Sequence, residues 1–133
     1  MKMLNNNIEE DYVSFKLAQK LVRKGFTQIP AVGTFAILYN ENGDPVTYEN
    51  YALKNSGLED GFIPRPTLQM AIKWIWINFH YHIEIPHIIG VYYWEINQTN
   101  IKNYIPMEAN DNFKTPVEAM EDAINYALTK LIK

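Results

Sequence analysis

The sequence predicts an α+β domain, in which helices pack on antiparallel β-hairpins. Three observations carry this prediction: two capped helical segments, an Asn-Gly turn between segments rich in β-branched and aromatic residues, and a strong helix start near the C-terminus. With 133 residues and one continuous pattern, we expect a single domain covering residues 1–133. The predicted order is α-β-β-α-β-β-α, with a four-stranded antiparallel sheet built from two hairpins.

The first predicted helix covers residues 15–24. Ser14 is a suitable N-cap, and Gly25 is a suitable left-handed stop. Apolar residues occupy one half of the helical wheel, so this half is expected to face the core. The other half is a basic face that contains Lys16, Lys20, Arg23 and Lys24.

The first hairpin is predicted from residues 34–39 and 46–51. Asn42 and Gly43 lie between these segments, and an Asn-Gly pair tolerates positive φ at both central positions of a tight turn. Residues 52–63 are expected to form a loop, because Gly, Asn, Ser and Asp residues interrupt them.

The second helix is predicted over residues 68–79, with Thr67 as its N-cap. Its wheel is apolar nearly all round, which is typical of a helix that is central or that offers a surface to a partner. The positions where the first helix carries polar or charged residues are occupied here by Ile72, Trp76 and Ile77. We expect these three side chains to contact a second copy or a protein partner. The alternative is that one of the two long predicted loops folds over them.

The second hairpin is predicted from residues 81–85 and 91–96, with a connection between them. An Asn-rich loop over residues 97–114 follows. The last helix begins after Thr115, where Pro116 and a capping-box glutamate mark the start, and runs to about residue 131. Four residues on the apolar sides of their elements are expected in the core: Leu21, Trp74, Ile75 and Ile83.

The first two helices align without gaps at an offset of 53 residues, which pairs Ser14 with Thr67 and Phe26 with Phe79. Each is followed by a predicted hairpin. A duplicated α-β-β unit explains this agreement. The other explanation is that two amphipathic helices with similar caps agree by chance.

All three histidines lie close together in the sequence, beside a glutamate. Imidazole and carboxylate groups suit a divalent metal, so a site formed by His80, His82 and Glu84 is one interpretation of this segment. The other is that these are polar residues on the outer face of a half-exposed strand, hydrogen-bonded to cross-strand neighbours. The second interpretation is favoured, because short histidine spacings are weakly specific.

Composition limits the remaining classes of function. A net charge of −3 argues against broad binding to nucleic acid, which leaves the basic face of the first helix as a weak candidate. No cysteine is present, and the sequence has no nucleophile motif and no cofactor fingerprint, so no cofactor is expected and an enzyme is not favoured. No apolar stretch is long enough to span a bilayer, and no signal peptide is visible, so we expect no membrane contact and a cytoplasmic location.

Several motifs together resemble a group of short uncharacterised proteins encoded by gut Bacteroidetes bacteria and by their phages and mobile elements. The motifs are Asp11-Tyr12-Val13-Ser14-Phe15, Lys24-Gly25-Phe26, Ile63-Pro64-Arg65-Pro66-Thr67 through Lys73-Trp74, His82-Ile83-Glu84-Ile85, and Glu118-Ala119 in the last helix. The resemblance implies a bacterial or phage setting and supplies no activity. Similar sequences tend to carry charged residues after this tryptophan, whereas this chain has Trp76 and Ile77, which favours their burial against another surface.

The function expected from the sequence is therefore that of a small intracellular binding or adaptor protein. It would act through protein contacts made by the second helix. The first alternative is a metal-dependent or other enzyme that uses the His80, His82 and Glu84 region. The second alternative is nucleic-acid binding through the basic face.

Overall fold

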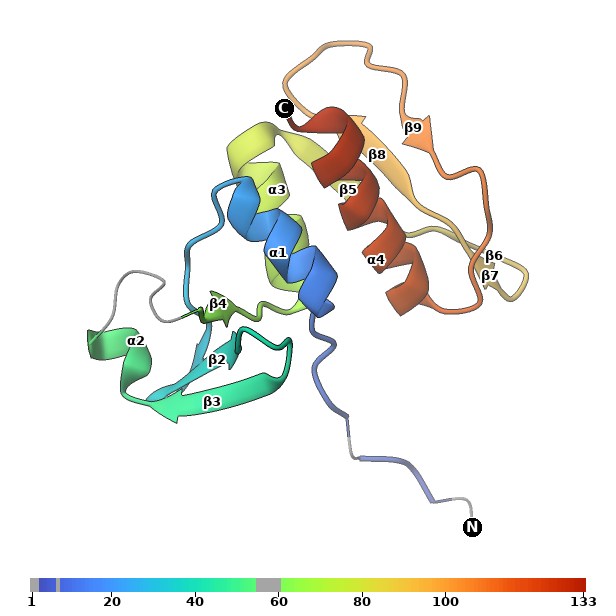
Figure 1. The fold of residues 1–133 in the computed structure, drawn as a ribbon. Helices are drawn as coiled ribbons and strands as arrows, with labels where there is room; N and C mark the ends of the chain where they lie inside the picture. Colours follow the sequence, from blue (N-terminus) through green and yellow to red (C-terminus); the bar gives the residue numbers. More distant parts are fainter. Residues whose placement is uncertain (1–2, 7, 55–60) are drawn as a thin grey trace.

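The computed structural model describes residues 3–6, 8–54 and 61–133, and it confirms the α+β class (Figure 1). The helices are α1 (Phe15–Arg23), α2 (Tyr51–Lys54), α3 (Leu68–Phe79) and α4 (Pro116–Tyr126), and α4 continues as a π-helical turn, Ala127–Leu131. The strands are β1 (Ala31–Val32), β2 (Phe35–Tyr39), β3 (Pro45–Glu49), β4 (Ile63–Pro64), β5 (Tyr81–Glu84), β6 (His87–Ile88), β7 (Val91–Tyr92), β8 (Glu95–Gln98) and β9 (Met107–Glu108).

Both predicted hairpins are present, as β2–β3 and β5–β8, but they lie in separate sheets. In the first sheet β2 pairs with β3 on one edge, and with β1 and then β4 on the other. In the second sheet β8 lies between β5 and β9, and β6 and β7 form a small ribbon of their own. In the predicted four-stranded sheet, the second hairpin would pair with an edge of the first. In the structure, the short strands β1 and β4 already pair with that edge of β2.

Three helices begin at the same end of the molecule and run side by side. Their N-caps are the predicted ones, since the hydroxyls of Ser14, Thr67 and Thr115 accept hydrogen bonds from the backbone N–H groups three residues later. The bonds between α1 and the last helix also show that these two are parallel: Ser14 meets Glu121, and Lys24 meets the carbonyl of Ile132. Figure 1 shows the shared direction of α1, α3 and α4.

A short antiparallel junction joins the residues that precede α1 to those that precede α3. The N–H of Val13 donates to the carbonyl of Pro66 at 3.0 Å, and the N–H of Leu68 donates to the carbonyl of Asp11 at 2.9 Å. The buried hydroxyl of Tyr39, on β2, donates to the carbonyl of Val13. The junction therefore fixes the starts of both helices to each other and to the first sheet.

The junction also bears on the alignment at an offset of 53 residues. Val13 and Pro66 are paired by that offset and face each other here, and the caps Ser14 and Thr67 have nearly the same backbone angles. Beyond the helices the two halves differ, because β5 follows α3 directly whereas β1 follows α1 only after residues 24–30. The common geometry thus covers the caps and first turns, and duplication of the whole unit stays a prediction.

The core lies between the three helices and the second sheet. Leu21, Ile75 and Ile83 are buried, as predicted. Trp74 is only half-buried, which corrects its predicted place in the core: it packs against the core from outside, with its ring edge-on to Phe26 and to Phe79 at 5.3 Å each.

The β2–β3 turn differs from the predicted one in its backbone. The N–H of Gly43 donates to the carbonyl of Asn40 at 3.0 Å, and Gly43 has φ of +84° whereas Asn42 has negative φ. This is a turn followed by one left-handed residue, and not a two-residue turn with Asn-Gly at its centre. A Cβ on Gly43 would lie 2.8 Å from Cδ2 of Phe15, so close packing also requires glycine here.

Three predicted segments are organised differently. The loop predicted over residues 52–63 contains the end of the one-turn helix α2 and the first residue of β4, and its residues 55–60 lie outside the described part. The strand predicted over residues 91–96 is interrupted, because Trp94 turns into the core and its Nε1 donates to Asp122 on α4 at 2.7 Å. The loop predicted over residues 97–114 contains β9.

We predict that Trp74→Ala lowers the free energy of unfolding by about 3 kcal/mol, because the indole fills the space between Phe26 and Phe79. Trp76→Ala is the matched control: this indole is 46% exposed, and its loss is expected to cost about 1 kcal/mol or less. Urea unfolding of both variants measures the difference. Equal losses would contradict the placement of the two indoles.

Candidate functional site

The outer surface of α3 is partly open to solvent. Trp76 is 46% exposed and Ile77 57% exposed, whereas Ile72 is half-buried against the core. The described parts of the two long loops, residues 52–54, 61–63 and 97–114, leave Trp76 and Ile77 exposed. The structure thus separates the three predicted interface residues, with two on the surface and one serving mainly the core.

An apolar groove runs beside α3, between this helix and the chain that follows α1. It consists of two adjoining cavities that share Gln28 and Met70. The first, of about 360 Å³, is lined by Phe26, Gln28, Met70, Lys73, Trp74, Ile77 and Asn78. The second, of about 410 Å³, is lined by Glu10, Tyr12, Gln28, Ile29, Pro30, Ala31, Val32, Ile37, Thr67 and Met70. We call these two cavities together the α3 groove.

One wall of the α3 groove is the edge of a β-sheet. The carbonyl of Pro30 accepts the N–H of Ile37 on β2 at 2.8 Å, so alternation along an antiparallel strand points the N–H and C=O of Ala31 away from β2. In the described part of the chain, no backbone hydrogen bond joins residues 27–29 or 31 to another segment. Ala31 is exposed, and Val32 is 63% exposed. This edge can therefore accept another strand.

An open strand edge next to an apolar groove is an arrangement that binds extended peptides. The edge supplies main-chain hydrogen bonds, and the groove receives alternate side chains. The opposite wall is formed by one side of α3, where Met70, Trp74 and Ile77 follow one another at helical spacing. Charge is sparse, with Lys73 in the first cavity and Glu10 in the second.

Sequence reasoning identified Trp76 and Ile77 as surface residues but missed the groove, whose first cavity Ile77 lines. Two local signals were available in residues 29–33. Pro30 in an apolar run is typical of an edge strand, and Gly33, with φ of +61°, makes the tight turn from β1 to β2. The position of this run against α3 depends on tertiary contacts, and no pattern in the sequence indicates it.

The three histidines do not lie on one face of a single strand, because they belong to three different elements. His80 ends α3 in a left-handed conformation, while Nε2 of His82 lies 3.2 Å from Oε1 of Glu84 at the surface. His87 belongs to the β6–β7 ribbon, where its Nε2 accepts the N–H of Gly90 at 3.0 Å. Within residues 3–6, 8–54 and 61–133, no group of three or more His, Cys, Asp or Glu side chains is placed to hold a metal ion.

Half of the basic face is used inside the fold. Lys20 donates to the side chain of Asn125, and Lys24 donates to the carbonyl of Ile132 at 2.9 Å. Lys16 and Arg23 are exposed. Two of the four basic residues of α1 are thus explained by their hydrogen bonds to the last helix and the residue that follows it. The two exposed cations that remain provide only a small positive surface for a nucleic-acid backbone.

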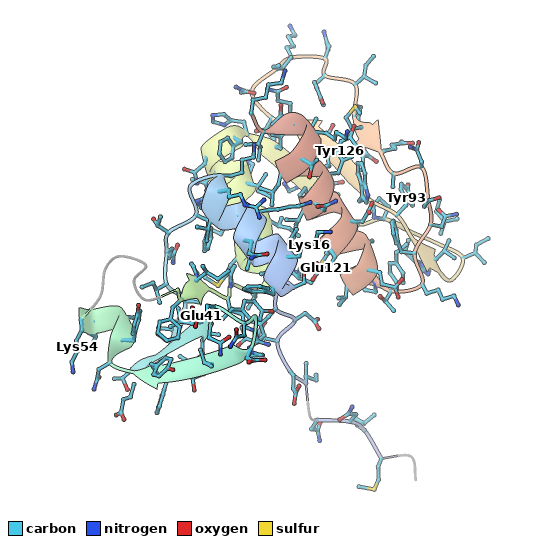
Figure 2. All side chains as sticks on the ribbon, in the orientation of Figure 1. Lys16, Glu41, Lys54, Tyr93, Glu121 and Tyr126 are labelled. Carbon is cyan, nitrogen blue, oxygen red and sulfur yellow. The ribbon has the colours of Figure 1, made fainter. Side chains whose placement is uncertain are left out.

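Glu121 lies where α4 faces the start of α1 (Figure 2). Its carboxylate accepts the N–H of Ser14 at 3.2 Å and the hydroxyl of Ser14 at 3.5 Å. Burial raises the pKa of Glu121 above its ordinary value, and the hydrogen bonds from Ser14 act in the opposite direction without cancelling the effect. This carboxylate caps a helix start in the fold and lies away from the α3 groove.

Comparisons of the chain with protein-family models, with curated proteins and with solved structures gave no match. None of the helices formed by the described residues is long and apolar enough to cross a membrane.

We predict that Glu121→Gln changes how stability depends on pH. In the wild type, folding raises the pKa of this carboxyl above its ordinary 4.5, so stability is lost as the pH rises from there through the folded-state pKa. Glutamine does not titrate. The stability of the variant relative to the wild type should therefore increase between acidic and neutral pH, as measured by urea unfolding at several pH values. A difference that stays constant over this range would contradict the prediction.

Proposed function

We propose that this protein is a protein-binding module that holds an extended apolar segment in the α3 groove. The observation that carries the proposal is the pairing of an open strand edge at Ala31 with the apolar side of α3. Ile77, which is 57% exposed, lines the first cavity, whereas Trp76, which is 46% exposed, belongs to neither lining and lies outside the groove. An adaptor role, in which one segment of another chain is gripped, follows from this arrangement.

The energetics of such a contact are favourable. A large apolar side chain contributes roughly 1.5–3 kcal/mol when it is fully buried, and the two cavities offer room for at least two of them. Main-chain bonds along the edge fix the register of the bound segment and bring affinity of their own. Few charged groups line the groove, so little charge has to be desolvated on binding.

The cellular setting is part of the same proposal. The resemblance to proteins of Bacteroidetes bacteria and their phages supports a cytoplasmic protein. A segment gripped in the α3 groove would then belong to another cytoplasmic protein or to a second copy.

We predict that the wild type selects peptides with large apolar side chains at alternate positions from a random library displayed on phage. Met70→Glu should abolish this selection, because it places a charge at the point where the two cavities join. Gln69→Glu is the matched control: this neighbouring residue is exposed and lines neither cavity, so selection should be unchanged.

Ile77→Glu provides a second test that spares the core, because Ile77 is 57% exposed. It should weaken the peptides selected by the wild type while the thermal midpoint stays close to the wild-type value. The proposal fails if the wild type enriches no such peptides, or if both groove variants enrich the same peptides as the wild type.

A further inference from the structure

The N-terminal segment carries large apolar side chains that are exposed to solvent. Met3 is 91% exposed, Leu4 79% and Ile8 89%. Figure 1 shows this segment leaving the common start of the helices and running away from the rest of the molecule. Three large apolar side chains on an extended segment are unfavourable in water and mark a contact surface.

We propose that the α3 groove is occupied by the N-terminal segment of a second copy of this chain, and that two copies exchange these segments around a two-fold axis. The inference rests on the proposed function and names its partner. In such a dimer each copy supplies one segment and one groove, so the contact is self-complementary and closed.

The place where the segment leaves the body supports the exchange. Glu10 and Tyr12 line the second cavity, so each segment begins at one end of its own groove. Across a two-fold axis perpendicular to the groove, this end of one copy lies opposite the first cavity of the other copy. The segment therefore enters its partner's groove at the first cavity, near Ile77, and runs toward the second.

This route gives the strand direction that the open edge accepts. Residues 26–32 run from the first cavity to the second. The incoming segment, followed from residue 3 to residue 10, runs the opposite way and so adds as an antiparallel strand. Six extended residues span roughly 20 Å, so residues 3–8 are long enough to follow residues 27–32.

Side-chain alternation and charge agree with the same route. Leu4 and Ile8 share one face of an extended segment, which can point into the two cavities, while Met3 lies on the other face. The incoming Glu9 and Glu10 come to the first cavity. Among the described residues, the lining of that cavity includes one cation, Lys73, and no carboxylate.

The test is sedimentation of the full chain over a wide concentration range. We expect a reversible dimer for the wild type. Leu4→Asp combined with Ile8→Asp should raise the dissociation constant at least a hundredfold, since the face that enters the groove becomes charged. Met3→Asp combined with Asn5→Asp adds the same charge to the opposite face and should have a much smaller effect.

Ile77→Glu should also give a folded monomer. A mixture of this variant with the Leu4→Asp, Ile8→Asp variant should form heterodimers, because one intact segment and one intact groove remain. A wild type that stays monomeric at all concentrations, or a dimer that is unchanged by the Leu4 and Ile8 substitutions, would overturn the proposal. If the wild type is monomeric but still selects peptides through Met70, the groove function stands and only the second copy is rejected.

Discussion

Two backbone hydrogen bonds between residues 11–13 and 66–68 bring together parts of the chain that are far apart in sequence, and most of the architecture follows from them. They set the starts of α1 and α3 side by side, and the hydroxyl of Tyr39 ties the first sheet to the same point. The guanidinium of Arg65 lies 4.2 Å from the ring centroid of Tyr12 and 5.4 Å from that of Tyr39, so a cation packed on two aromatic faces covers the junction.

The α3 groove is a consequence of this junction. With both helix starts fixed, the chain that leaves α1 returns along α3, where Phe26 is buried against the edge of Trp74. It then reaches β1, which pairs with β2. The strand β4 pairs with the next part of the same edge of β2, and the chain continues from β4 into α3. The helix and the sheet edge thus form two walls of one groove. The N-terminal segment emerges beside it, because that segment leads directly into the junction.

The parts of the fold that depend on local chemistry could be predicted from the sequence. Capping hydroxyls and helical periodicity are local properties, which is why α3 has the predicted bounds and the caps of all three long helices are correct. Trp94 is a residue for which local chemistry is not enough. The sequence predicts it within a strand, but its indole N–H donates a hydrogen bond to Asp122 and the strand is interrupted there. Likewise, the open edge at Ala31 becomes a site only because the junction places it against α3. Trp76 and Ile77 could be identified because an apolar residue on an expected outer face is itself a local signal.

Hydrogen exchange of the backbone amide of Ala31 tests most directly whether the groove binds a strand. This N–H points away from β2, so it should exchange rapidly in dilute protein. At higher protein concentration it should become protected, because a carbonyl of the added strand accepts its hydrogen bond. The amide of Val13, which is buried and bonded to Pro66, provides the slow reference at every concentration. Protection of Ala31 that increases with concentration, and that is lost in the Leu4→Asp, Ile8→Asp variant, is the predicted result. Rapid exchange of Ala31 at the highest concentration would contradict addition of a second copy's strand at this edge.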